Sequence, residues 1–172
     1  MITLGLDQYL SVKNYVNKNN GWGEDAVRRP EYDAIVKAAG LGKFTTDPSV
    51  SIYGANVGVT AAYWRKANHI HKWFVANVQN GEDECREHYV GIDKLKELVA
   101  VCADVLLHKD DKGYCEDVLP TGSGFFFGST EYDEWYFAEV EYTHKRLTEI
   151  VNLLEEAVKN DEWFDVTYQS SW

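Results

Sequence analysis

Apolar residues recur at spacings of three and four along much of the chain, which is the period of an α-helix. Helices are predicted over residues 31–39, 60–79, 93–107 and 131–159. Gly40 follows the first of these segments and is expected to end it. Asp93 stands where its side chain can cap the first turn of the third. The last segment is the longest, and at about 1.5 Å per residue it predicts a helix of roughly 40 Å.

Strands are indicated mainly at the two ends of the chain. Residues 163–169 alternate between apolar and polar side chains, which is typical of a half-buried strand. We expect this strand to pair with one over residues 1–7, and a helix to follow over residues 8–17. Shorter strands are predicted at residues 50–53, 57–59 and 125–127. The pattern predicts a single α+β domain over residues 1–172, mainly helical, with a small β-sheet joining the amino- and carboxyl-terminal segments.

Composition and charge restrict the partners of such a domain. The chain has 172 residues and a formal net charge of −11, from 17 basic and 28 acidic side chains. This charge repels the phosphate backbone of nucleic acids and anionic membrane surfaces, so direct binding to either is not expected. No apolar run is long enough to cross a membrane and no signal peptide is evident, so we expect a cytoplasmic protein.

The strongest positive charge of this acidic chain lies within the predicted helix over residues 60–79. Steps of four place Arg65, His69 and Trp73 along one side of that helix, and Trp64 and His71 elsewhere on it. Cationic and aromatic side chains together can bind an anionic or aromatic ligand. The alternative is that the cations pair with nearby carboxylates and the tryptophans pack the helix against its neighbours.

The glycine-rich segment 119–135 precedes the last predicted helix. Such a loop can hold a phosphate, but it lacks the lysine and the glycine spacing of a P-loop. Ser129 or Thr130, followed by Asp133, is typical of a capping box, which favours a structural role.

Catalytic and metal chemistry have little support in the sequence. His69 and His71 would diverge by about 200° on a helix and could not share one ion. The three cysteines, Cys85, Cys102 and Cys115, show no CxxC spacing, and Cys102 fits a core position. No nucleophile elbow occurs. We therefore assign no catalytic residue, no metal site and no cofactor.

Two motifs, YWRKANHIHKWF at residues 63–74 and SGFFFGSTEYDEWY at residues 123–136, resemble those of a family of small proteins encoded by bacteriophages and prophages. The resemblance extends over almost the whole chain. It implies a phage accessory protein without an assigned enzymatic activity, acting in the cytoplasm of the host cell. Proteins of this kind are often counter-defence factors.

We expect the two motif segments to face each other across a shared ligand-binding groove. The residues expected to line it are Trp64, Arg65, His69, His71, Trp73, Tyr132 and Trp135. The function that follows is non-enzymatic: binding and sequestration of a small anionic or nucleotide-like ligand, or of a host defence protein. The aromatic content also leaves room for an exposed patch and a homodimer.

Two other functions are kept as alternatives. A hydrolase acting on a nucleotide-like substrate would use His69 or His71 as acid–base, with carboxylates from Asp133 and Glu134. It requires one of these histidines within about 3 Å of a carboxylate in a concave pocket. An acidic mimic of nucleic acid would block a host DNA-binding protein, and it requires one continuous stripe of carboxylates on the surface.

Overall fold

The computed structural model describes residues 5–21, 26–45 and 54–172. These residues form two compact units. The larger unit holds the described residues up to Val12 and those from Thr60 to Trp172, and the smaller unit lies within Lys13–Val59. The single-domain organisation over residues 1–172 stays a prediction.

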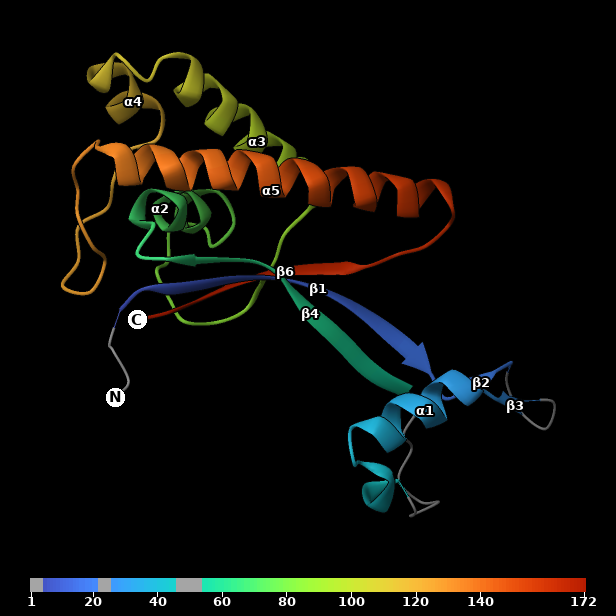
Figure 1. The fold of residues 1–172 in the computed structure, drawn as a ribbon. Helices are drawn as coiled ribbons and strands as arrows, with labels where there is room; N and C mark the ends of the chain where they lie inside the picture. Colours follow the sequence, from blue (N-terminus) through green and yellow to red (C-terminus); the bar gives the residue numbers. More distant parts are fainter. Residues whose placement is uncertain (1–4, 22–25, 46–53) are drawn as a thin grey trace. The chain divides into compact units, whose positions relative to one another are not determined.

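A four-stranded sheet with the order β4-β1-β6-β5 supports the larger unit (Figure 1). Its strands are β4 (Gly54–Arg65), β1 (Asp7–Asn17), β6 (Asp165–Ser171) and β5 (His88–Tyr89). The short β5 pairs antiparallel with β6, with His88 opposite Tyr168. Because β6 lies beside β1, the sheet joins the two ends of the chain, as predicted.

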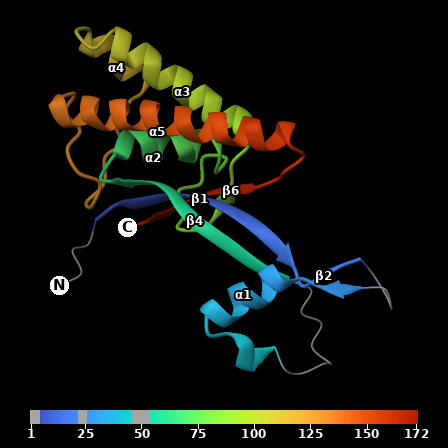
Figure 2. The same ribbon diagram turned by 45° about the vertical axis from the view of Figure 1, so that its right-hand side comes forward.

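The helices of the larger unit lie in layers over this sheet. They are α2 (Asn68–Asn77), α3 (Ile92–Leu107), α4 (Lys112–Val118) and α5 (Glu134–Lys159). Figures 1 and 2 both show α2 between the sheet and α5, and α3 on the opposite side of α5. The apolar faces of α3 and α5 are buried, and Lys96 of α3 pairs with Glu155 of α5 at 2.7 Å.

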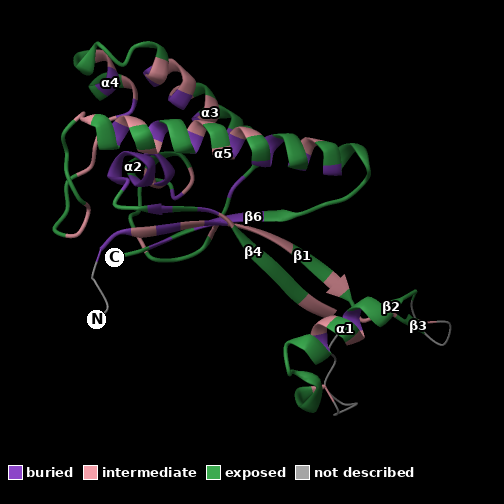
Figure 3. Cartoon of the chain, in the orientation of Figure 1, coloured by how far each residue is buried: buried purple, intermediate pink, exposed green. Residues whose placement is uncertain are grey.

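The core lies where these layers meet. Leu98 and Cys102 of α3 and Leu147 of α5 are fully buried, as are Trp64 and Phe74 nearer the sheet. Figure 3 shows the same concentration of buried residues along α2 and the inner face of α5. Helices packed on a sheet that joins the two ends of the chain confirm the α+β fold.

The smaller unit is built around one helix. In α1 (Pro30–Ala38), Tyr32 and Val36 are buried, and Pro30 occupies the first turn, where a missing N–H costs nothing. Strands β2 (Asn19–Asn20) and β3 (Val27–Arg28) pair antiparallel, and a short 3₁₀ helix follows at Gly42–Phe44. The helix predicted over residues 31–39 is confirmed.

Two predicted helices are wrong wholly or in part. Residues 8–17 belong to strand β1, where buried Gln8 and Leu10 alternate with less buried neighbours. The predicted helix over residues 60–79 is a strand as far as Arg65 and a helix only from Asn68. Residues up to Arg65 form a strand because Ala62 and Trp64, two residues apart, both face the core. The helix was predicted there because apolar residues further along the chain recur at spacings of three and four.

Turn and cap predictions also need correction. Residues 125–127 form a turn rather than a strand, and the side chain of Phe125 is 95% exposed. Helix α3 is confirmed, but its N-cap is Gly91, so Asp93 does not cap it. Helix α5 begins at Glu134 with Asp133 itself as N-cap, so the capping box starting at Ser129 or Thr130 is wrong.

Four other strand predictions have different outcomes. The strand at residues 57–59 is confirmed as part of β4, and the one at residues 163–169 as β6. The strand predicted at residues 50–53 and the first four residues of the predicted amino-terminal strand lie outside the described residues. Of the rest of that amino-terminal strand, Gly5 and Leu6 are not in a strand, and β1 begins only at Asp7.

Candidate functional site

A cavity of about 270 Å³ lies in the larger unit where β4 turns into α2 and faces the start of α5. We call it the Trp135 cavity. The residues that line it are Arg65, Lys66, Ala67, His69, Gly128, Ser129, Glu131, Asp133, Trp135, Tyr136 and Glu139. It therefore combines the first motif segment, the glycine-rich loop and the first turns of α5.

One wall of the Trp135 cavity is formed by the tight turn between β4 and α2. Lys66 has a positive φ of 60°, which reverses the chain before Ala67 caps the helix. The first turn of α2 has neither a capping side chain nor an acidic residue. Since the first amides of a helix have no intrahelical partner, this end of α2 favours a negatively charged group.

Asn68 holds the glycine-rich loop against this turn. Its buried side chain donates from Nδ2 to the carbonyls of Phe127 (3.0 Å) and Ser129 (2.7 Å). Its Oδ1 accepts from the backbone N–H of Gly122 at 3.0 Å. The two motif segments therefore contact each other, as predicted, through an asparagine that was not among the expected site residues.

Gly128 allows the loop to approach the β4–α2 turn closely. Its φ is +91°, and a Cβ added there would lie 3.0 Å from Lys66 Cβ and 3.2 Å from the Lys66 carbonyl oxygen. We expect Gly128→Ala to lower the free energy of unfolding by about 2 kcal/mol, measured by urea denaturation, because the backbone conformation is strained for alanine. Gly42→Ala is the control, since no described atom lies within 4 Å of its added Cβ and its φ is not positive. Equal costs at the two positions would contradict this account.

The opposite wall is the start of α5. Asp133 Oδ1 accepts from the N–H groups of Trp135 (3.0 Å) and Tyr136 (3.1 Å), which fixes the first turn. Tyr136 turns inward and donates its hydroxyl proton to the carbonyl of Leu119 at 2.9 Å. Trp135 turns outward and is 75% exposed, so its indole is available at the rim of the Trp135 cavity.

His69 lines the Trp135 cavity as a neutral imidazole. Its side chain is 4% exposed, and its ring lies 4.4 Å from the Tyr136 ring, centroid to centroid. Burial lowers the pKa of His69 to about 3. Its Nε2 atom is buried without a hydrogen-bond partner among the described residues. Such a group is costly to leave unsatisfied, so it is a candidate contact for a ligand.

Glu139 is a second polar group in the Trp135 cavity that lacks a protein partner. Its side chain is half-buried, and burial raises the pKa of its carboxyl. Within the part of the chain that the structure describes, this carboxyl makes neither a hydrogen bond nor an ion pair. It lies four residues after Trp135, so both side chains share one face of α5.

The two walls carry opposite charges. The basic wall has Arg65, which pairs with Asp7 at 3.3 Å, and Lys66. The acidic wall consists of Glu131, Asp133 and Glu139. The Trp135 cavity therefore presents hydrogen-bond donors on one side and acceptors on the other.

Of the residues expected to line a shared groove, Arg65, His69 and Trp135 meet at this cavity, whereas the other four have different surroundings. Trp64 is buried and donates from Nε1 to Thr143 Oγ1 at 2.8 Å. Trp73 packs edge-on against Phe74 in the core. Tyr132 accepts from the Thr121 N–H at 3.1 Å. The alignment of Arg65, His69 and Trp73 along one helix is wrong because Arg65 belongs to β4.

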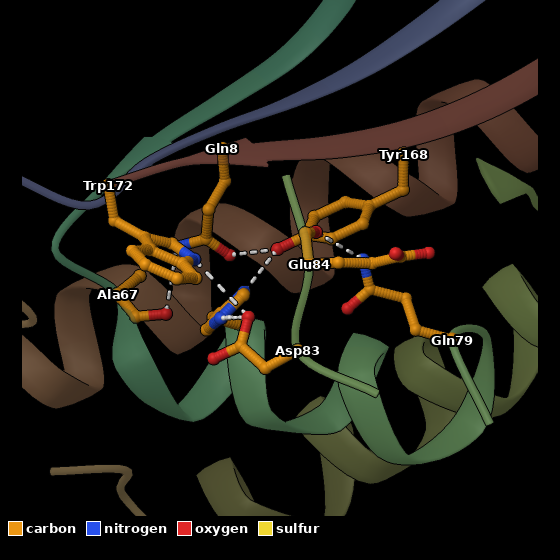
Figure 4. A network of polar contacts seen from close by, with 8 residues as sticks. Gln8, Ala67, Gln79, Asp83, Glu84, Tyr168 and Trp172 are labelled. Atoms are coloured by element: carbon orange, nitrogen blue, oxygen red, sulfur yellow. Dashed lines mark hydrogen bonds and ion pairs between the residues drawn. The ribbon is translucent and has the colours of Figure 1, made fainter. Parts of the chain in front are cut away.

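His71 is 2% exposed and belongs to a different polar network. Figure 4 labels the other members of this network, Gln8, Asp83, Tyr168 and Trp172. Its Nδ1 lies 2.8 Å from the Tyr168 hydroxyl, which donates to Gln8 Oε1 at 3.0 Å. Its Nε2 lies 3.0 Å from Asp83 Oδ1, which also accepts from Trp172 Nε1 at 3.2 Å. This network ties α2 to both terminal strands.

The pair of His71 and Asp83 has the spacing that the hydrolase alternative requires, but neither residue lines the Trp135 cavity. Asp133, one of the proposed carboxylates, already accepts two backbone N–H groups as the N-cap of α5. The histidine–carboxylate pair that the hydrolase alternative requires is therefore not found at the Trp135 cavity.

The lining residues outside the expected set include Gly128, Tyr136 and above all Glu139. The sequence could have pointed to Glu139, because it follows Trp135 by one helical turn and so shares a helix face with it. Among many exposed acidic residues of the same helix, however, its lack of a partner can be seen only in three dimensions.

The described residues contain neither a metal-binding cluster nor a membrane-spanning helix. No group of three or more His, Cys, Asp or Glu side chains there could hold a metal ion. No helix within the same residues is long and apolar enough to span a membrane. Comparison with known protein families, curated proteins and solved structures gives no match to this chain.

Proposed function

We propose that this protein binds and sequesters a small nucleotide-like molecule in the Trp135 cavity, without converting it. The observation that supports this most directly is the pair of polar groups without a protein partner in one cavity, the buried His69 Nε2 atom and the half-buried Glu139 carboxyl. Leaving a buried group such as His69 Nε2 without a partner costs about 1–3 kcal/mol. A bound molecule that pairs with them would remove this cost.

The opposite charges of the two walls favour a ligand with two different ends. The basic wall and the uncapped end of α2 suit an anionic group such as a phosphate. The acidic wall suits hydroxyl and amino donors, and the exposed indole of Trp135 offers a surface for a planar ring. A nucleotide has all three features, whereas a simple inorganic anion uses only the basic wall.

The biological setting is proposed from the resemblance of the two motifs to phage and prophage proteins. On that basis the protein is an accessory factor, with a counter-defence role, in the cytoplasm of an infected bacterium. Capture of a nucleotide-like signal would remove it from the host. Binding of a host defence protein is the other form of sequestration that this setting suggests.

The test is native mass spectrometry of the full chain purified from a bacterial host, followed by calorimetric titration with the four ribonucleoside 5′-monophosphates. We expect a retained small molecule, or binding of at least one nucleotide. Trp135→Ala should weaken that binding about tenfold or more, because stacking on an aromatic ring contributes about 1–3 kcal/mol per base.

Trp163→Ala is the matched control, since Trp163 is also well exposed but lies outside the Trp135 cavity. Its affinity should equal that of the unmodified protein. Failure to retain or bind any of these molecules, or equal losses in the two variants, would refute capture of a nucleotide in this cavity.

A further inference from the structure

We propose that the Trp135 cavity selects a ring with two adjacent N–H donors, the pattern on the Watson–Crick edge of guanine, and that the Glu139 carboxylate accepts both. The ring would stack on Trp135. This inference rests on the proposed function and specifies the ligand of the same site.

The first argument is the placement of Glu139 relative to Trp135. Residues four apart on a helix have Cβ atoms about 5–6 Å apart on the same face. Both side chains line the Trp135 cavity, one exposed at its rim and the other half-buried. A planar ring lying on the indole would therefore present its edge to the carboxylate.

The second argument is the chemistry of the carboxylate. An ionised carboxylate only accepts hydrogen bonds, and its two oxygens can receive two parallel donors. Among the four RNA bases, guanine alone has two neighbouring donors on this edge, the ring N1–H and the 2-amino group. Adenine would place the lone pair of N1 against a carboxylate oxygen, which is repulsive. Hypoxanthine keeps the ring N–H but lacks the 2-amino group.

Glu139 is half-buried and has no partner among the described side chains. Burial raises the pKa of its carboxyl, and no side chain of the described residues neutralises it or donates to it. Two donors on the edge of a ligand would supply the hydrogen bonds that the protein does not give to Glu139. The other acidic residues of the wall differ, because Asp133 is occupied as the N-cap of α5 and Glu131 is exposed.

The remaining groups of the cavity suit the rest of such a ligand. Lys66 and Arg65 lie on the opposite wall, where they can contact a 5′-phosphate. His69 is neutral, so it can hydrogen-bond to an uncharged part of the ligand. The inference therefore assigns the base to the α5 wall and the phosphate to the β4–α2 turn.

The experiment is calorimetric titration of the full chain with GMP, AMP and IMP under one buffer condition. We expect GMP to bind about tenfold to a hundredfold more tightly than AMP, the range for one good bidentate contact. IMP should bind more weakly than GMP. Guanosine, which lacks the phosphate, should also bind more weakly than GMP.

Glu139→Gln makes the test specific. An amide offers one acceptor and one donor, which matches the donor and acceptor of adenine, so the preference should shift from GMP towards AMP by about tenfold or more. Glu141→Gln is the matched control, because Glu141 is exposed on the same helix and should leave the GMP preference unchanged. Circular dichroism verifies that both variants are folded.

The outcomes separate the two proposals. Equal affinities for GMP, AMP and IMP in the unmodified protein would overturn the guanine inference and leave nucleotide binding intact. The same conclusion follows if Glu139→Gln is folded and keeps the GMP preference. If Glu139→Gln does not fold, the ratio of GMP to AMP and IMP in the unmodified protein decides. No binding of any nucleotide would overturn both proposals.

Discussion

Acidification to about pH 4.5 is expected to lower the free energy of unfolding by about 2.7 kcal/mol through His69 alone. The pKa of His69 falls from 6.5 in the unfolded chain to about 3 in the folded protein because the imidazole is buried. Between these two values the unfolded chain binds a proton that the folded protein does not. The contribution of His69 to the free energy of unfolding is therefore fully present above pH 6.5, and it decreases by about 1.4 kcal/mol per pH unit as the pH falls towards 3.

The measurement is urea unfolding of the unmodified protein and of His69→Phe at pH 7 and at about pH 4.5. Phenylalanine keeps a ring against Tyr136 but cannot bind a proton, so this variant should lose about 2–3 kcal/mol less on acidification. His71, whose pKa burial also lowers, and Glu139, whose pKa burial raises, act in both proteins and cancel in the comparison. An identical acid response of His69→Phe and the unmodified protein would refute this account.

Asn68→Ala is expected to lower the free energy of unfolding by about 3 kcal/mol. The substitution removes the partners of the Phe127 and Ser129 carbonyls and of the Gly122 N–H. An unsatisfied buried group costs about 1–3 kcal/mol, and these groups are partly reached by water, so the total lies below the sum of three full penalties. Because the loop forms one wall of the Trp135 cavity, nucleotide binding should be lost as well.

Asn77→Ala serves as the control in the same urea unfolding experiment. Asn77 makes a single side-chain hydrogen bond, from Nδ2 to the Trp73 carbonyl at 2.8 Å, within its own helix. Its substitution should cost about 1 kcal/mol or less and leave the loop in place. A similar small cost at Asn68 would show that the loop is held by other contacts.

The long helices could be predicted because their local pattern and their burial agree. In α3 and α5 the residues at helical spacing, such as Leu98 and Leu147, are the ones that the fold buries. Strand β6 could be predicted from its alternation for the same reason, because the apolar residues Val166 and Tyr168 are buried. The helix predicted over residues 8–17, where the structure has strand β1, is wrong because a polar residue, Gln8, occupies a buried position. The alternation of apolar and polar residues is therefore not visible there in the sequence.

The candidate site was predicted in part. The sequence indicated that the segments around Asn68 and Phe127 would meet, and it included three residues of the Trp135 cavity. It could not place Arg65 correctly, because the expected helix continued through a turn that the positive φ of Lys66 creates. It also grouped His71 with His69, although the two imidazoles belong to separate environments.

The amino-acid sequence by itself determined the α+β class, the long helices α3 and α5 and the carboxyl-terminal strand β6, since each depends on a periodic pattern of apolar residues. Tertiary structure alone decided which polar groups lack a partner. His69 and Glu139 resemble many other histidines and glutamates in the sequence, and their distinction comes from burial beside groups that neither donate to them nor neutralise them. Desolvation and hydrogen-bond satisfaction depend on neighbours distant in the chain, so local patterns do not encode them.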